Sequence, residues 1–271
     1  MTPTVTPFLR WAGSKRQLLP KLSRYYTPGR RYFEPFVGSA ALFFAVHPMR
    51  AVLSDINLDL IETFVRIRDN FRGVSTALEE LSTGEKSYYS LRALDPKSLD
   101  PLQRAARFIF LNRYCFNGLY RTNLSGKFNV PFSPTKTGAL PSREHLEACS
   151  RRLSKSKLVC SDFEDILLSE VRAGDFVYLD PPFAVENRRV FRQYGPTTFG
   201  FADLERLGKL LCELHERGAH FVLSYAYCSE SRRTFNQWKT RRVYTQRNIA
   251  GFAKHRRRAV ELIVSNIEEV Y

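Results

Sequence analysis

Phe176-Val177-Tyr178-Leu179-Asp180-Pro181-Pro182-Phe183 is the stretch around which this chain is organised. Its first four residues are apolar and follow Gly174-Asp175, a pattern that predicts a short buried strand. Proline donates no backbone hydrogen bond and keeps the preceding residue extended, so the chain leaves this strand in a stiff turn. Open α/β sheets bind ligands at the carboxyl ends of their strands. The stretch therefore predicts a site that presents a carboxylate and an aromatic ring. A strand-ending loop with a capping Asp180 and a buried Phe183 is the alternative.

Other strand signals alternate with helical periodicity along the chain. A strand is expected from Arg31 into the Gly38 turn, before a helix of small and apolar residues. The other predicted strands are Ala51–Ser54, Leu158–Cys160, Phe221–Tyr225, Val243–Tyr244 and Val260–Val264. Leucines at helical spacing from Leu204 to Leu214 predict an amphipathic helix that ends at Gly218. The alternation predicts an α/β protein with a mainly parallel sheet.

The regular rhythm breaks between Asn57 and Leu140. Apolar residues at helical spacing near Leu58 and Leu102 predict helices, and no third core strand is expected before Leu158. A gap of this length predicts an inserted, mainly helical module. The expected organisation is a catalytic domain formed by residues 1–56 and 141–271, with a helical domain at residues 57–140.

Charge is the strongest feature of the composition. The 271 residues include 42 Lys and Arg against 27 Asp and Glu, a net charge of +15. Basic pairs and runs recur throughout, for example Arg30-Arg31, Arg151-Arg152, Arg232-Arg233, Arg241-Arg242 and His255-Arg256-Arg257-Arg258. This balance favours a polyanionic partner over a merely basic surface, and nucleic acid is the expected one.

Cysteine, histidine and hydropathy patterns exclude several classes of protein. The five cysteines are Cys115, Cys149, Cys160, Cys212 and Cys228. They form no C-x-x-C pair, and four have apolar or helix-periodic surroundings that predict buried thiols in a reducing compartment. The histidines show no ligand spacing, so we expect no metal site. No apolar run approaches the roughly 20 residues of a membrane span, and no signal peptide is indicated. We expect a cytoplasmic protein.

Three short motifs could contribute to a ligand-binding site, and one of them is a nucleoside-binding arrangement. Asp55 ends a predicted strand 17 positions after Gly38, and a glycine turn with a downstream acid can hold ribose hydroxyls. The turn is not G-x-G-x-x-G, and Asp55 could also cap the next helix. Asp162-Phe163 could hold the amine and face of a purine, or act as a strand end with a helix cap. Lys15 could hold a carboxylate at a helix start, or be a solvated lysine after an ordinary cap.

Leu111–Pro131 interleaves aromatic residues with Asn, Arg and Gly around a predicted turn at Ser125-Gly126. Asn and Arg read base edges, and aromatic side chains can wedge into a base stack. The alternative is a hairpin whose Asn residues make turn bonds. In so basic a chain, the pattern favours a nucleic-acid recognition loop.

Together these motifs resemble the Dam-type DNA adenine-N6 methyltransferases of the alpha motif order. The resemblance rests on Phe8–Lys15, Glu34–Ala40, Leu111–Pro131 and Asp180–Phe183. It implies a Rossmann-like S-adenosyl-L-methionine-dependent methyltransferase sheet with an inserted target-recognition domain. The implied cofactor is S-adenosyl-L-methionine, and the implied partner is double-stranded DNA.

The resemblance also implies roles for individual residues. The catalytic residues would be Asp180, Pro181, Pro182 and Phe183. The residues that contact the cofactor would be Trp11, Lys15, Phe36, Gly38, Asp55, Asp162, Phe163 and Asp180. The residues that contact DNA would be Phe116, Asn117, Leu119, Arg121, Asn123 and Pro131. Among these, Phe116 and Asn117 would enter the emptied position of the duplex, and Arg121 would read a guanine.

Two departures from the family pattern stand out. Phe183 replaces the usual tyrosine, which keeps the stacking face and loses a hydroxyl. The basic segment His255–Arg258 stands where the family has a Gly-containing loop.

The implied reaction is methyl transfer to N6 of a flipped adenine, with GATC suggested as the target. The alternatives are cytosine-N4 methylation, whose tetrapeptide usually begins with Ser, RNA or protein methylation, and a non-catalytic DNA-binding relative. We expect a monomer with no obligate protein partner. A cognate restriction endonuclease, mismatch-repair marking and phage self-protection all stay open.

Overall fold

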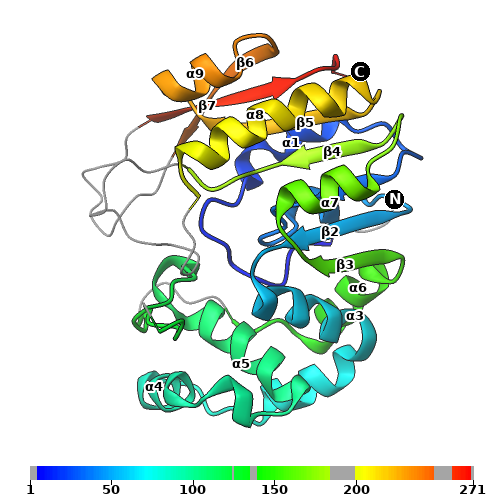
Figure 1. The fold of residues 1–271 in the computed structure, drawn as a ribbon. Coiled ribbons are helices and arrows are strands. Elements are labelled where there is room, and N and C mark those ends of the chain that lie inside the picture. Colours follow the sequence, from blue (N-terminus) through cyan, green and yellow to red (C-terminus); the bar gives the residue numbers. More distant parts are fainter. Residues whose placement is uncertain (1–4, 124, 135–138, 184–198, 247–257, 270–271) are drawn as a thin grey trace.

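The computed structural model describes residues 5–123, 125–134, 139–183, 199–246 and 258–269. In these residues seven strands form one sheet in the order β3-β2-β1-β4-β5-β7-β6 (Figure 1). The strands are β1 (Tyr32–Glu34), β2 (Ala51–Asp55), β3 (Ser156–Cys160), β4 (Phe176–Leu179), β5 (His220–Ala226), β6 (Lys239–Gln246) and β7 (Arg258–Ser265). β1 to β5 pair in parallel, whereas β7 is antiparallel to both β5 and β6. The predicted strands and the mainly parallel α/β sheet are confirmed.

The order of the strands defines where a ligand can bind. β1 lies between β2 and β4, so the chain winds outward in two directions from β1. Such a switch point leaves a crevice at the carboxyl ends of the two central strands. The chain segments that follow β1 and β4, including Gly38 and Asp180, therefore meet at this edge.

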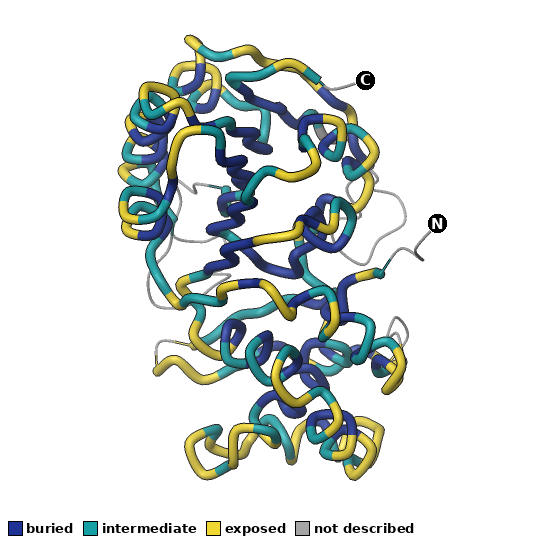
Figure 2. Tube along the Cα trace, turned by 90° about the vertical axis from the view of Figure 1, so that its right-hand side faces the viewer, coloured by how far each residue is buried: buried dark blue, intermediate teal, exposed yellow. Residues whose placement is uncertain are grey.

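β4 is held by hydrophobic packing on both faces of the sheet. Phe176 and Tyr178 belong to one buried cluster, and Val177 and Leu179 belong to a second one. This alternation follows from the period of two in a strand, and each buried side chain contributes about 1.5–3 kcal/mol. The strand that carries Asp180 is thus anchored in the core, which appears as dark blue in Figure 2.

Helices cover both faces of the sheet. On one face lie α7 (Phe163–Glu170) and α8 (Phe201–Glu216), which supply most helical residues of the second cluster. The other face is covered by shorter elements, η1 (Arg16–Leu18), α1 (Leu19–Leu22), η2 (Ser23–Tyr25) and α2 (Ala41–Val46). The helix predicted around Leu204 to Leu214 is confirmed as α8. A short helix, α9 (Ser229–Thr234), follows β5.

The chain between β2 and β3 is helical in the described residues. It contains α3 (Leu58–Glu79), α4 (Glu85–Ala93), η3 (Pro96–Ser98), α5 (Pro101–Tyr114), η4 (Phe116–Gly118) and α6 (Arg143–Leu153). α5 begins at a capping box formed by Asp100 and Gln103, with Pro101 in its first turn. Figure 1 shows α3, α4 and α5 gathered below the sheet. The expected helices at this position are confirmed, and no strand pairs into the sheet from this part of the described chain.

Two expectations need correction. Only Cys115 and Cys149 are buried, because Cys160 lies at the exposed carboxyl end of edge strand β3 and the other two thiols are half-buried. Asp55 does not cap the next helix, since Asn57 accepts the N–H of Leu60 as the cap of α3.

The basic segment His255–Arg258 lies outside the described residues except for Arg258. In the described ranges, no helix combines the length and apolar character needed to cross a membrane.

Candidate active site

Asp180 follows β4 at the switch point, and one of its oxygens is held from two sides. Lys15 Nζ donates to Asp180 Oδ1 at 2.6 Å, and Ser224 Oγ of β5 donates to the same oxygen at 3.1 Å. The hydroxyl groups of Ser224 and Tyr178 are 3.0 Å apart, and both side chains are buried. The neighbouring strand and the N-terminal segment thus fix Oδ1 in place.

Lys15 is buried beside the tetrapeptide and is only 8 % exposed. Besides Asp180, its Nζ donates to Gly13 O at 3.1 Å, lies 3.9 Å from Glu261 Oε2 and lies 5.5 Å from the centre of the Phe183 ring. The solvated lysine is thus wrong, and the carboxylate that Lys15 contacts in the structure is that of Asp180. Desolvation offsets much of the attraction in a buried ion pair, so this pair matters more for orientation than for stability.

Glu34, the last residue of β1, is a further carboxyl group close to Asp180. Its Oε2 accepts a hydrogen bond from Tyr32 Oη at 2.8 Å, and its side chain is buried. Burial raises the pKa of Glu34 to about 8, although the bond from Tyr32 acts in the opposite direction. Glu34 is therefore mostly protonated at pH 7, and the site does not carry its full negative charge.

The remaining residues of the tetrapeptide form a supported aromatic wall. Pro181 is buried and Phe183 is half-buried. The Phe183 ring meets the buried Tyr225 of β5 edge to face, with centroids 5.3 Å apart and planes at 90°. Such edge-to-face contacts favour a defined ring orientation. Phe183 is thus braced by Tyr225 from the adjacent strand.

A tight turn joins β1 to α2 beside β2. Gly38 has φ of +45°, and its N–H donates to Asp55 Oδ2 at 3.3 Å. A Cβ at Gly38 would lie 2.8 Å from Trp11 Cδ1, so this close approach requires glycine. Burial raises the pKa of Asp55 to about 6, against the hydrogen bonds donated by the N–H groups of Asn57 and Gly38. Trp11 in turn stacks on Tyr120, with centroids 6.0 Å apart.

Asp162 and Phe163 lie at the carboxyl end of β3, at the start of α7. Asp162 Oδ1 accepts the N–H of Glu164 at 2.9 Å, so the predicted helix cap is present. Its Oδ2 accepts a bond from Arg206 Nη2 at 2.9 Å, and the same guanidinium lies 4.4 Å from the centre of the Phe163 ring. Phe36 packs on Phe163 with centroids 5.2 Å apart. Both oxygens of Asp162 are therefore engaged.

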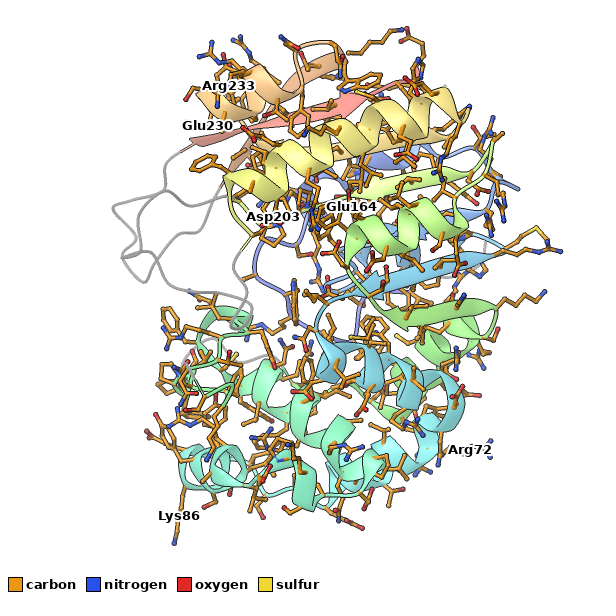
Figure 3. All side chains as sticks on the ribbon, viewed as in Figure 1. Arg72, Lys86, Glu164, Asp203, Glu230 and Arg233 are labelled. Atoms are coloured by element: carbon orange, nitrogen blue, oxygen red, sulfur yellow. The ribbon has the colours of Figure 1, made fainter. Side chains whose placement is uncertain are left out.

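Figure 3 shows where the acids around this guanidinium come from: Glu164 on α7 and Asp203 on α8 lie close to each other. Arg206 lies 3.2 Å from Glu164 Oε2 and 3.3 Å from Asp203 Oδ1. One arginine of α8 thus connects three carboxylates and covers Phe163. It pins α8 to the end of β3.

The stretch Leu111–Pro131 continues from α5 as an antiparallel loop with the predicted turn at Ser125-Gly126. Asn123 Oδ1 accepts two backbone N–H groups of this turn, at 3.0 and 2.9 Å. Arg121 Nε donates to Asn129 Oδ1 at 2.8 Å. The alternative of a hairpin whose Asn residues make turn bonds therefore holds for Asn123. Arg121 is oriented by the side-chain amide of Asn129.

The other predicted DNA contacts sit at the base of this loop. Phe116 is 38 % exposed, and Asn117 adopts a left-handed backbone with φ of +55°. Leu119 is half-buried against the core, whereas Pro131 is exposed. Phe116 and Asn117 form a strained, accessible corner rather than a continuation of α5.

The structure brings the predicted residues together in three groups. The first is Lys15, Asp180, Pro181, Pro182 and Phe183. The second is Trp11, Gly38 and Asp55. The third is Phe36, Asp162 and Phe163. The loop residues form a separate group, which is joined to the second by the stack of Trp11 on Tyr120.

Sequence reasoning missed four residues that organise these groups: Glu34, Arg206, Ser224 and Glu261. A buried hydroxyl or carboxyl inside an apolar strand is the signal that points to Ser224, Glu34 and Glu261, because such groups need partners. Arg206 gives no such signal, since an arginine between the leucines of a surface helix is ordinary.

A carboxylate fixed by two donors beside a braced aromatic ring, at the switch point of a parallel sheet, is an arrangement typical of an enzyme active site. Residues 11–250 match the family described as D12 class N6 adenine-specific DNA methyltransferase. The chain belongs to this family, and it is a DNA methyltransferase specific for adenine N6. The expected resemblance to Dam-type enzymes is confirmed.

Curated relatives match over most of the chain. The Type II methyltransferase M1.LlaDCHI of Lactococcus lactis subsp. cremoris is 31% identical over 96% of this chain and 95% of its own length. Type II methyltransferase M.MjaIII of Methanocaldococcus jannaschii is 35% identical over 82% and 85%. The DNA adenine methylase of Escherichia coli K12 is 33% identical over 94% and 93%.

Proposed function

We propose that this chain methylates N6 of an adenine flipped out of duplex DNA, with S-adenosyl-L-methionine as methyl donor and GATC as target sequence. The observation that carries the proposal is the fixed carboxylate of Asp180 beside the half-buried ring of Phe183. The Asp180–Pro181–Pro182–Phe183 turn supplies hydrogen-bond acceptors and a stacking face at one point. The exocyclic amine of adenine needs the acceptors, and the ring that carries this amine needs the stacking face.

The residues at the switch point fit S-adenosyl-L-methionine. Gly38 lets the tight turn and the Trp11 indole come together beside Asp55, because a Cβ at this position would meet Trp11 at 2.8 Å. The turn thus places Trp11 and Asp55 where both can contact the cofactor. With a pKa of about 6, Asp55 is mostly ionised at pH 7 and can accept hydrogen bonds from ribose hydroxyls. Phe36 is half-buried and packs on the buried Phe163, so this pair supports an apolar place for the adenine on the side of Phe36. When bound, the cofactor supplies an electrophilic methyl group on a sulfonium centre.

The cofactor residues would thus be Trp11, Lys15, Phe36, Gly38, Asp55, Asp162, Phe163 and Asp180. Asp162 can accept only a few further hydrogen bonds from the cofactor, because its two oxygens already accept bonds from Glu164 and Arg206. A carboxylate has about four lone-pair sites, so each oxygen can accept one further bond. Arg206 would then fix the acid that meets the cofactor amine.

Asp180 and Pro181 prepare the adenine amine for attack. Since Oδ1 of Asp180 is held by Lys15 and Ser224, Oδ2 is the oxygen that we assign to the substrate. It accepts one N6 hydrogen, and the carbonyl oxygen of Pro181 accepts the other. These bonds free the nitrogen lone pair from the ring and strengthen as positive charge develops on N6, so they favour the transition state.

Phe183 and Glu34 complete the site. Phe183, braced by Tyr225, stacks on the flipped base and fixes the line of attack. With the cofactor bound, N6 would take the methyl group as the methyl–sulfonium bond breaks, and the electron pair of that bond would stay on the sulfur of the departing thioether. N6 then loses one proton to solvent, so no covalent enzyme intermediate is needed. Because Glu34 is mostly protonated at pH 7, it adds little negative charge beside Asp180.

Recognition of the target is assigned to the helical domain at residues 57–140, with the catalytic domain formed by 1–56 and 141–271. We assign contacts with DNA to Phe116, Asn117, Leu119, Arg121, Asn123 and Pro131. Extruding the adenine from the duplex costs about a few kcal/mol. Phe116 and Asn117 would fill the position that the adenine vacates. Arg121, oriented by Asn129, would read a guanine edge.

The proposed sequence specificity is tested by mapping N6-methyladenine in DNA from cells that express the protein. Methylation confined to GATC is the expected result. Methylation at another sequence would overturn the proposed target. A failure to transfer labelled methyl groups to plasmid DNA would show that the protein is a non-catalytic DNA-binding relative.

All the residues proposed to act lie on one chain, which supports action as a monomer. A DNA substrate supports a cytoplasmic location.

A further inference from the structure

A cluster of two arginines and two tyrosines lies beyond the tetrapeptide Asp180–Phe183, outside the residues proposed to bind the cofactor and to read DNA. Tyr227 directly follows β5, and the guanidinium carbons of Arg242 and Arg232 lie 4.4 Å and 5.5 Å from the centre of its ring. Both arginines are exposed, and Tyr244 of β6 is 69 % exposed. We call Tyr227, Arg232, Arg242 and Tyr244 the Arg–Tyr cluster.

The register of the sheet connects this cluster to the active site. Tyr225, which braces Phe183, pairs with Leu262 of β7, and Leu262 pairs with Arg242 of β6. Directly paired residues point to the same face, so Arg242 lies on the face of Tyr225, about 10 Å away across two strand spacings. Tyr227 is two residues beyond Tyr225, on the same face. The cluster therefore adjoins the ring assigned to the flipped base.

Charge distinguishes these arginines from their neighbours. Arg241, the residue before Arg242, faces the other side of the sheet and is paired with Glu269. Among the described residues, no carboxylate lies within 4.0 Å of either guanidinium of the cluster. The acid of α9, Glu230, accepts a bond from Ser229. The guanidinium groups of Arg232 and Arg242 thus lie against the same aromatic ring. A bound anion would offset the repulsion between these two positive charges.

Figure 1 shows α9 and β6 above the end of β4 and the loop Leu111–Pro131 below it, on the same side of the molecule. Glu230 and Arg233, labelled in Figure 3, mark the upper end of that side. A duplex read by the lower loop would pass the tetrapeptide toward the cluster. The helical module and the cluster then flank the flipped nucleotide.

We propose that the Arg–Tyr cluster binds DNA phosphates next to the flipped adenine, on the side opposite the recognition loop; this rests on the proposed function. Arg232 and Arg242 supply the charge, and Tyr227 keeps the two side chains extended by stacking. Tyr244 supplies a hydroxyl that can donate to a phosphate oxygen. Phosphate contacts position a duplex without reading its sequence, so the cluster contributes equally to any sequence.

The test compares Arg232→Ala/Arg242→Ala with wild type and with Arg72→Ala. Arg72 is a matched control, because it is exposed and stacks on Phe71 at 5.7 Å but lies on α3, at the other end of the molecule in Figure 3. Binding is measured over a range of salt concentrations to two duplexes, one with a site that wild type methylates and one with that site scrambled.

The salt slope, log K against log salt, should shrink by about 0.9 for each phosphate that the protein no longer neutralises. The double variant should therefore bind both duplexes with a slope smaller by almost two, with KM for DNA raised and kcat kept. Arg72→Ala should behave like wild type.

Three results would overturn the proposal: an unchanged slope, a loss limited to the methylatable duplex, or a fall in kcat at saturating DNA. Tyr227→Phe and Tyr227→Leu test whether the arginines need an aromatic ring to stack on, or whether their positive charge alone is enough. Phe keeps the ring and should keep affinity, whereas Leu should weaken binding to both duplexes. Equal behaviour of these two variants would contradict the role of the ring. If wild type methylates no duplex, the assigned activity fails instead, and the salt slopes on the scrambled duplex still test the cluster, because phosphate contacts do not depend on sequence.

Discussion

Lys15 Nζ lies 2.6 Å from Asp180 Oδ1, although 165 positions separate the two residues in the chain. Ser224 donates to the same oxygen, so two donors from different elements converge on one carboxylate oxygen. In the proposed mechanism, this asymmetry divides the carboxylate into an oxygen that is held by the protein and an oxygen that meets the substrate. The orientation of Asp180 is thus set before substrate binds, which lowers the cost of reaching the transition state.

Asp180→Ala should abolish methylation, with kcat lowered by about 10³-fold or more, because the acceptor for the amine is lost. DNA affinity should stay close to that of wild type, since Asp180 does not belong to the residues assigned to the duplex. Methyl-transfer assays and DNA titrations measure the two effects. Glu216→Ala, an exposed acid of α8, is the control. Near-normal turnover of Asp180→Ala would contradict the mechanism.

Ser224→Ala should lower kcat by about tenfold, because one hydrogen bond worth roughly 1–1.5 kcal/mol no longer orients Asp180. It also leaves the buried hydroxyl of Tyr178 without this partner, which should lower the free energy of unfolding by about 1–3 kcal/mol. Turnover and chemical unfolding are the two measurements.

The double variant Ser224→Ala/Tyr178→Phe distinguishes positioning from stability. It removes both hydroxyl groups, so the stability should recover while kcat stays low. Recovery of kcat together with stability would show that Ser224 acts only through packing.

The sequence predicted the strands well, because short apolar runs such as Phe176–Leu179 end at strong turn signals. It also placed Gly38 and Asp55 correctly at one edge, since parallel strands bring their carboxyl ends together. It could not tell whether Lys15 was solvated or buried, because that depends on Asp180, a residue distant in the chain.

The hydrogen-bond partners of polar side chains were the feature that the sequence predicted least well. Asn112 belongs to the stretch expected to read bases, yet it bonds both backbone groups of Arg10 and is buried. Asn123 uses its side-chain oxygen to hold the turn. An amide fits equally well as a base contact or a backbone staple until its neighbours in space are known.

Glu34→Gln should change how stability depends on pH. The pKa of Glu34 is about 8 in the folded protein against 4.5 ordinarily, so the folded state holds a proton that the unfolded state releases. The favourable contribution is complete below pH 4.5 and is lost as the pH rises through about 8. Unfolding by urea from pH 5 to 9 should therefore show wild type losing a few kcal/mol, since each pH unit between the folded and unfolded pKa values corresponds to about 1.4 kcal/mol.

The Gln variant should show a flatter curve over the same range, because it stays neutral while it keeps a carbonyl oxygen for Tyr32. Glu216→Gln, at an exposed position, serves as the control and should follow wild type. A Glu34→Gln curve parallel to that of wild type would show that Glu34 is ionised in the folded protein.

Asp55 should make cofactor binding depend on pH. Burial raises its pKa to about 6, and only the ionised carboxylate accepts hydrogen bonds from two ribose hydroxyls. The affinity for S-adenosyl-L-methionine should therefore be full above pH 7 and fall by about tenfold for each pH unit below pH 6. Calorimetric titration of cofactor between pH 5 and 8 measures this. Asp55→Asn should bind weakly at every pH, with a flat profile and an intact Gly38 turn. A wild-type profile that stays flat down to pH 5, or an Asn variant that keeps the wild-type slope, would show that another group governs cofactor binding.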